Sequence, residues 1–409
     1  MTFDRPAWFI GNVPWLFAAR MARSFSQAML VIVVPLYVSA AGYSTLKVGY
    51  LLSLALAGST GMTLLVGVFS DRYGRKLILT IIALMAVIGS AAYALTTQFW
   101  VLALMAAMAS VRGGGAGSGG GFGPFYPAEQ ALIAGSGSDK DRNSIFSSLS
   151  LVGVLAGAAG SAVAGLPGIL QRHFETSRIN SFHPVFWIAA LASLSVFFLT
   201  LPIQERPQLS PTKSKMEPKI STGNLIARLW LTNGINGFVI GIVGPFLTYW
   251  CAVRYGVRST EIAALYTIAN LLTAVSYLAA PSIAKRLGAV RSIVLTRLGT
   301  VVLMAGMALA PSFFLAAVAY TIRVMVNSIS MPIRQSFIMG VAAEQSRSKV
   351  AAIGSLPAQA TGMVAPTIAS HLMHSISEVA PIWLVTAALA VNACLFSLFF
   401  KNITPPEEK

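Results

Sequence analysis

Residues 46–97 read LKVGYLLSLALAGSTGMTLLVGVFSDRYGRKLILTIIALMAVIGSAAYALTT, two apolar runs separated by the charged segment GVFSDRYGRK at 67–76. A membrane-spanning helix needs about 20 mostly apolar residues. The runs 46–70 and 77–97 are each long enough, and the charged segment is short enough to be the loop between them. This stretch therefore predicts two consecutive transmembrane helices joined by a tight basic loop.

Apolar segments of this length recur along the whole chain. We place twelve of them, near residues 13–40, 46–70, 77–97, 99–134, 143–170, 184–203, 224–251, 260–284, 291–310, 312–341, 349–375 and 379–400. The segment between the sixth and the seventh, 204–222, is rich in Pro, Ser and Lys and is expected to be a linker. The sequence thus predicts an all-α membrane protein with two six-helix bundles, at 1–203 and 223–409.

Composition excludes an ordinary soluble protein. Of the 409 residues, 56% are hydrophobic and 10% are charged, whereas soluble domains carry about a quarter charged residues. The net charge of +16 sits in short bursts between apolar segments rather than on one basic face, so we expect no nucleic-acid partner. The partners expected instead are membrane lipid and a small-molecule substrate, and we expect a monomer.

The basic residues also predict an orientation. With the N-terminus inside, 17 Lys and Arg residues fall in the connections on the cytoplasmic side. The opposite side has only five, Lys47, Arg172, Arg178, Arg254 and Arg258. Because basic residues are retained in cytoplasmic loops, we expect a multi-pass protein of the cell membrane with both termini in the cytoplasm.

An internal repeat supports the division into halves. Residues 127–135, PAEQALIAG, align with residues 332–340, PIRQSFIMG, and the same offset places Arg142 on Arg347. The basic loop has a degenerate copy at 285–288. Each bundle is therefore expected to be a diverged copy of the other.

The segment 67–76 matches G-x-x-x-D-R-x-G-R-[KR], and on this motif the chain resembles the major facilitator superfamily of secondary transporters. The resemblance implies alternating access between the two bundles. It also implies a conformational switch, to which we assign Gly67, Asp71, Arg72, Gly74, Arg75, Glu129 and Arg142. The alternative is a basic loop that only fixes topology. Many relatives carry an acid where this chain has Gly135, and Glu129 is the candidate replacement partner for the basic loop.

Arg112, in the fourth segment, begins RGGGAG and resembles the R-x-x-x-G motif of antiporters in this family. The fifth segment departs from the antiporter pattern, with Ala158 where a proline is characteristic. Arg323 occupies the comparable place in the tenth segment, and structural pairing is the alternative for both arginines. Arg20, Arg23 and Arg297 are nearer the helix ends, where snorkelling to the interface is at least as good an explanation.

In this family helices 1, 4, 7 and 10 line the central path, with contributions from helices 5, 8 and 11, so the polar residues of these helices are the candidate substrate-binding residues. We select Arg23, Gln27, Arg112, Asn233, Asn236, Asn270, Arg323, Asn327 and Gln359. For each amide, a hydrogen bond between helices worth about 0.6 kcal/mol is the alternative.

All acidic residues except Glu129 map to loops, termini or helix ends, so the expected path is net positive. We therefore expect a secondary transporter of a small neutral or anionic solute, proton-coupled, with efflux preferred because of the Arg112 motif. Alternatives are a multidrug/proton antiporter for cationic or lipophilic drugs, an uptake symporter, and, in a different class, a non-transporting receptor or scaffold. No nucleotide-binding loop, zinc-spaced cluster or nucleophile elbow occurs in the sequence, so we expect no enzyme, cofactor or metal site.

Overall fold

The computed structural model describes residues 11–108, 123–125, 128–129, 132, 139–204, 222–287, 289–341 and 347–400. Within these ranges the chain forms helices and no strands. The N-terminal helices are α1 (Val13–Ala40), α2 (Thr45–Tyr73), α3 (Arg75–Leu95), α4 (Phe99–Met108), α6 (Asp139–Val163), α7 (Leu166–His173), the short 3-10 turn η2 (Asn180–Phe182) and α8 (His183–Thr200). The C-terminal helices are α9 (Thr222–Gly241), η3 (Ile242–Phe246), α10 (Leu247–Tyr255), α11 (Ser259–Leu287), α12 (Ala289–Leu309), α13 (Phe313–Val341), α14 (Arg347–Ser375) and α15 (Ala380–Phe400).

The all-α membrane fold predicted from the apolar runs is confirmed. In the described ranges, nine helical stretches are long and apolar enough to cross a membrane, and the apolar helix α4 is described over ten residues. The long helices α11 and α14, each 29 residues, fall at two further predicted segments. A count of twelve is consistent with these elements. Most of the predicted linker, residues 205–221, lies outside the described residues.

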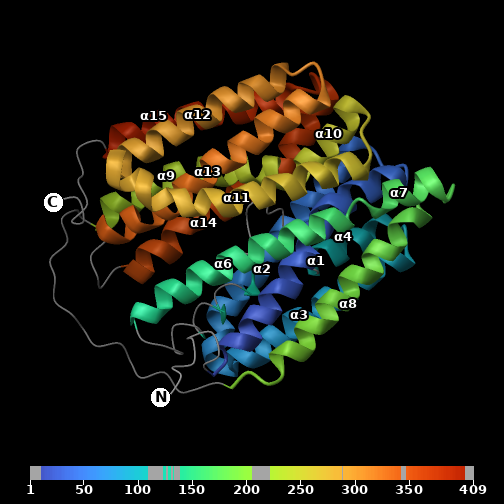
Figure 1. Cartoon of the computed structure of the whole chain (residues 1–409), viewed down its shortest axis with the longest axis horizontal. Helices are drawn as coiled ribbons and strands as arrows, with labels where there is room; N and C mark the ends of the chain where they lie inside the picture. The colour runs from blue at the N-terminus through green and yellow to red at the C-terminus, as the bar shows by residue number, and fades with distance from the viewer. Residues whose placement is uncertain are drawn as a thin grey trace, which may run out of the picture.

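Two groups of helices are visible in Figure 1, one coloured blue to green and the other yellow to red. In the first group α1 packs on α6 and α8, α3 packs on α8, and α2 packs on α4. In the second, α9 packs on α14 and α15, and α12 packs on α13 and α15. The groups meet along two seams, α2 with α14 and α6 with α11.

The first helix of each group is interrupted by proline. Pro35 lies inside α1, and Pro245 lies inside η3, a five-residue π-helical turn that joins α9 to α10. Proline cannot donate the backbone hydrogen bond of a regular helix, and π-turns are frequent at functional sites. Pro35 is residue 23 counted from the start of α1, and Pro245 is residue 24 counted from the start of α9, so the two prolines give a register for comparing residues between the bundles.

Hydrogen bonds between the two groups gather at one end, which we call the closed end. There α2 and α11 begin, and α7 and α14 finish. The Thr367 hydroxyl lies 2.7 Å from the Ser53 hydroxyl, and the Gly168 amide donates to the Ser259 hydroxyl over 2.9 Å. Further pairs at this end are Thr45 with Tyr249, Tyr50 with His371, Thr260 with Gly165, Thr267 with Ala158 and Asn270 with Ser161.

Close packing reinforces the α2–α14 seam. A Cβ atom added at Gly49 would lie 2.4 Å from the Cβ of Ser370 and 2.9 Å from the carbonyl oxygen of Pro366. Only a glycine permits this approach of the two helices. The hydrogen bonds named above lie away from the opposite end, where α1 begins and α15 finishes, which we call the terminal end.

Candidate functional site

A buried ionic cluster lies in the N-terminal bundle. One carboxylate oxygen of Glu129 accepts hydrogen bonds from Arg20 over 2.7 Å and from Arg23 over 2.9 Å. Both arginines are on α1, about 10 and 15 Å from its first residue at the helical rise of about 1.5 Å per residue. All three side chains are buried, with Glu129 only 1% exposed. The cluster carries a net charge of +1.

This pairing corrects one expectation. Arg20 and Arg23 do not snorkel to the membrane interface, because their guanidinium groups are held inside the bundle by Glu129. The predicted contact of Glu129 with the basic segment 67–76 stays a prediction, because the side chains of Asp71 and Arg72 lie outside the described set. The other carboxylate oxygen of Glu129 is buried and has no hydrogen-bond partner among the described residues. A lone buried carboxylate would be very costly, and the two arginines supply the positive charge that offsets this cost.

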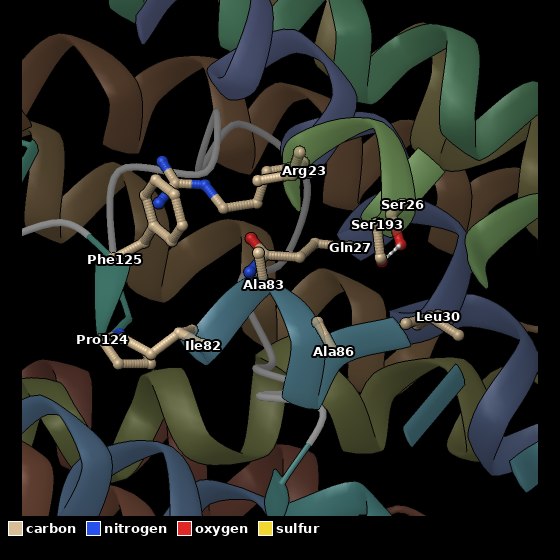
Figure 2. Close-up of a pocket in the computed structure, with 11 residues that line it drawn as sticks. Arg23, Ser26, Gln27, Leu30, Ile82, Ala83, Ala86, Pro124, Phe125 and Ser193 are labelled. Carbon is tan, nitrogen blue, oxygen red and sulfur yellow. Dashed lines mark hydrogen bonds between the residues drawn. The ribbon is translucent and has the colours of Figure 1, made fainter. Parts of the chain in front are cut away.

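A small cavity of about 30 Å³ lies beside this cluster, lined by α1, α3, α8 and residues 124–125. Figure 2 shows the Arg23 guanidinium against the ring of Phe125, at 4.5 Å from its centroid, and the Gln27 amide also lines the cavity. Ser26 and Ser193 are joined by a hydrogen bond in its wall. The space admits about two water molecules. Arg23 and Gln27, both predicted to bind substrate, thus share a cavity that is water-sized in this conformation.

The C-terminal bundle has a polar cluster of different composition. Arg334 of α13 donates to the side-chain oxygen of Asn233 on α9, and the amide nitrogen of Asn233 donates to the carbonyl of Gly354 over 2.6 Å. Arg297 of α12 donates to the side-chain oxygen of Asn392 on α15 and stacks on Phe396, 4.6 Å from the ring centroid. Arg297 is therefore buried and bonded, and it does not snorkel either.

Arg323 belongs to a separate cluster, closer to the middle of α13. It is 8% exposed, and its Nε atom has no hydrogen-bond partner among the described residues. Tyr266 and Tyr320 are near enough to act electrostatically on it, and their rings lie 5.8 Å apart. The Tyr266 hydroxyl donates to the carbonyl of Gly244 in the π-turn over 3.3 Å. The cluster thus places a charged group beside an irregular, proline-containing part of the seventh span.

The remaining predicted binding residues are dispersed. Asn270 is buried and donates to Ser161 across the α6–α11 seam, so in this conformation it serves contact between the bundles. Asn236, Asn327 and Gln359 are partly buried, and one buried side-chain oxygen of Gln359 has no partner among the described residues. Arg112 lies outside the described residues. The role of these residues in binding stays a prediction.

Part of the predicted switch can be placed. Gly74 has a φ of 94° between α2 and α3, a backbone conformation that favours glycine, and Arg75 begins α3 half-buried. Gly67, Asp71 and Arg72 lie in α2, and Arg142 lies in α6. The structure describes the backbone at these positions and not the side chains.

Four residues of these clusters were not selected from the sequence as functional: Arg20, Arg297, Arg334 and Asn392. For Arg20 a signal exists, since Arg20 and Arg23 are three residues apart and so share one face of a helix. For Arg334 the signal is the internal repeat, which places it on Glu129. The described residues contain no group of three His, Cys, Asp or Glu side chains able to hold a metal ion.

Comparison with protein families gives one assignment for nearly the whole chain. The model of the Major Facilitator Superfamily matches residues 16–229 and again residues 229–409. Among curated proteins, the chain is 25% identical over 344 residues to the multidrug resistance protein MdtG of Dickeya zeae, covering 81% of this chain and 78% of that protein.

Other relatives are matched over less of their length. The chain is 24% identical to an uncharacterized membrane protein of Saccharomyces cerevisiae and covers 34% of it. It is 28% identical to MdtG of Citrobacter koseri and covers 65% of it. The chain thus spans between about a third and two thirds of the length of these two relatives.

Solved structures share the fold at low sequence identity. The nucleoside transporter NupG is similar with a TM-score of 0.72 at 13% identity, over 95% of this chain and 99% of that one. An inward-facing bacterial homologue of the lysosomal transporter Spinster also gives 0.72, at 15% identity over 95% and 96%. At such identities the likeness concerns the fold.

Proposed function

Because the chain belongs to the major facilitator superfamily, we propose that it is a proton-coupled secondary transporter that exports a small neutral or anionic organic solute. The family match covers both halves of the chain, and the nine spans make it a multi-pass membrane protein. Export is supported by the similarity to proteins named MdtG, which are described as multidrug resistance proteins. The helix 4 motif around Arg112 points in the same direction.

The single observation that carries the substrate preference is the Arg20–Glu129–Arg23 cluster. Among the side chains that the structure describes, Glu129 is the one buried carboxylate, and two guanidinium groups already hold it. A cationic solute that used Glu129 would have to compete with both arginines and would leave two buried positive charges behind. A neutral or anionic solute meets no such penalty. The proposed preference for neutral or anionic solutes follows from the positive net charge of the cluster.

The excess of basic residues at 67–76 and in the other predicted inner loops supports a terminal end that faces the cytoplasm. The closed end would then face outward, and the structure would be the conformation that is accessible from the cytoplasm. An exporter loads its solute in that conformation. The reorientation would open the seams at Gly49 and Asn270 and bring the terminal ends together.

Proton coupling is assigned to Glu129. Protonation removes its charge and weakens its hold on Arg20 and Arg23, so the position of α1 against the fourth span depends on the proton. In an exporter, proton entry from outside would drive this change and solute loading from the cytoplasm would reverse it. The cavity beside Arg23 gives water a place near the pair.

Uptake together with protons is a second candidate, favoured by one electrostatic property of the same cluster. Protonated Glu129 leaves a net charge of +2 in place of +1, which raises the affinity for an anion. Proton and anion would then bind cooperatively and travel in the same direction. The two candidates differ in the sign of the proton flow that accompanies the solute.

The test is proton flux in proteoliposomes that contain an entrapped pH-sensitive dye. Each member of a panel of organic anions, neutral solutes and cations is added outside vesicles of wild-type protein and of the Glu129→Gln variant. Proton movement opposite to the solute, lost in the variant, supports coupled export, and movement with the solute supports uptake. Proton flux driven only by cations, or unchanged in Glu129→Gln, would contradict the proposal.

A further inference from the structure

The two polar clusters occupy equivalent places in the two bundles. Arg23 lies twelve residues before Pro35 in α1, and Asn233 lies twelve residues before Pro245 in the seventh span. The repeat that aligns residues 127–135 with 332–340 places Glu129 on Arg334. In both bundles the same pair of positions is hydrogen-bonded, by Arg23 with Glu129 and by Arg334 with Asn233. The geometry is repeated, and the chemistry differs.

The difference is the missing carboxylate. In the N-terminal bundle, the arginines of α1 have their counter-ion in Glu129. In the C-terminal bundle the acid position holds Arg334, and the arginine position holds the neutral Asn233. The side-chain hydrogen bond of Arg334 among the described residues goes to that amide, and its buried Nε atom has no partner there.

A second guanidinium belongs to the same network. Asn392, which accepts from Arg297, donates over 2.6 Å to the carbonyl of Thr232, the residue next to Asn233. Arg297 and Arg334 are also near enough to interact electrostatically. The network therefore joins α9, α12, α13, α14 and α15 and carries two positive charges. In the described part of the chain, no carboxylate bonds to either of them.

Two like charges held by neutral amides are unfavourable in a low-dielectric interior unless an anion accompanies them. Arg334 is partly buried as a residue, and its buried Nε atom has no partner among the described residues, so the guanidinium retains donors for a small anionic group. A guanidinium fork binds a carboxylate at two points, and the Asn233 amide beside it supplies a further polar contact. We infer that Arg334, with Asn233 and the charge of Arg297, forms a binding site for the carboxylate group of the transported solute.

This inference rests on the proposed function. It adds the location of a solute-binding site and the chemical group of the solute that the site would bind. The site would recognise an organic solute that bears a carboxylate. That carboxylate would be the counter-ion of Arg334 in the C-terminal bundle, as Glu129 is the counter-ion of Arg20 and Arg23 in the N-terminal bundle. Arg334 would thus be a specificity-determining residue. Asn392 acts through Arg297 and is a positioning residue.

The probes are acetate and benzoate, each compared with its neutral isostere, acetamide or benzamide, and with sodium chloride at equal ionic strength. Thermal shift of the purified full-length protein in lipid nanodiscs reports binding, because a ligand of the folded state raises its apparent stability. The wild type should be stabilised by a carboxylate and not by its amide. Arg334→Gln should weaken carboxylate binding about 10- to 100-fold, the equivalent of a lost hydrogen-bonded charge pair.

Two further variants separate binding from folding. Arg228→Gln is the control, since Arg228 lies on α9, the helix of Asn233, and donates to the backbone carbonyl of Phe399, and this variant should bind carboxylates as the wild type does. The double variant Asn233→Arg, Arg334→Glu copies the N-terminal arrangement and supplies its own carboxylate. It should keep the melting temperature of the wild type in the absence of ligand and lose the response to acetate and benzoate.

The inference is overturned if no carboxylate stabilises the wild type more than its amide. It is also overturned if chloride stabilises it equally, or if the double variant still binds benzoate. None of these results bears on proton flux in proteoliposomes. Coupled transport of neutral solutes without carboxylate binding would therefore leave the proposed function standing and remove this site. Carboxylate binding without proton flux would support this site and contradict the proposed proton-coupled transport.

Discussion

Gly49 is the position where a single methyl group should shift the conformational equilibrium. It lies on α2 at the closed end, against α14 of the other bundle. In Gly49→Ala the new Cβ would be 2.1 Å from the Ser370 hydroxyl oxygen, 2.4 Å from the Ser370 Cβ and 2.9 Å from the Pro366 carbonyl oxygen. Rotating the hydroxyl relieves only the first contact, so the helices themselves must separate.

The magnitude follows from these distances. Carbon atoms rest about 3.5–4.0 Å apart, so α2 and α14 must move apart by about 1 Å at this point. Overpacking of this kind costs about 1–3 kcal/mol. Under alternating access the cost applies only while the closed end is closed. The equilibrium should therefore shift toward the opposite conformation by about 5- to 150-fold.

Spin labels at Ser44→Cys and Ser377→Cys would measure the shift as a longer distance between the bundles at the closed end. Both serines are exposed, and Cys251 and Cys394 are replaced first. The matched control is Gly58→Ala, also on α2, where the clash is with Ala107 of α4 in the same bundle.

The control should lower stability without changing the distance distribution. Adding Ser370→Gly to Gly49→Ala removes the two shortest contacts and should restore most of the original distribution. An unchanged distribution in Gly49→Ala, or an equal change in Gly58→Ala, would refute the reasoning.

Four shorter predictions concern charge and topology. Glu129→Gln leaves two buried arginines without a counter-ion and should cost about 3 kcal/mol of stability, measurable by thermal unfolding; a cost below the scatter of repeats would contradict the buried pairing. Arg323→Lys keeps the charge but loses the planar fork, so solute binding should weaken in titrations while the melting temperature is kept; equal loss of both would indicate a structural residue. Asp71→Asn should slow transport and leave equilibrium affinity within a few fold, and the opposite pattern would assign it to binding. A cysteine at Ser214 should react with an impermeant reagent only in permeabilised cells; reaction in intact cells would reverse the topology.

The fold could be predicted from the sequence because its signal is local. Apolar runs such as 77–97 fix helix positions by length alone. The charged segment 67–76 marks a boundary between two such runs, and the structure places that boundary at Gly74, between α2 and α3. The pairing of residues on different helices is not local. The bonds of Glu129 to Arg20 and Arg23 on α1 were not predicted, because they depend on how two apolar helices are rotated against each other.

The conformation was equally inaccessible from the sequence. Asn270 is polar on a path-lining helix and was selected for binding, but in this conformation it joins the bundles through Ser161. A transporter of this fold presents the same residues to a path in one state and to a seam in another, so no sequence pattern separates these uses. Arg334 shows the converse case, since the repeat identified its position and only the contact with Asn233 showed its importance.

The central claim is that the sign of the buried clusters selects neutral or anionic solutes. It is tested most directly by the response of the wild-type protein in lipid nanodiscs to benzoate, benzamide and benzylammonium, three ligands of similar size with charges of −1, 0 and +1. Thermal shifts at equal concentration and ionic strength rank their affinities for the folded state. The account predicts stabilisation by benzoate or benzamide and none by benzylammonium. Stabilisation by benzylammonium above that of the other two would contradict it.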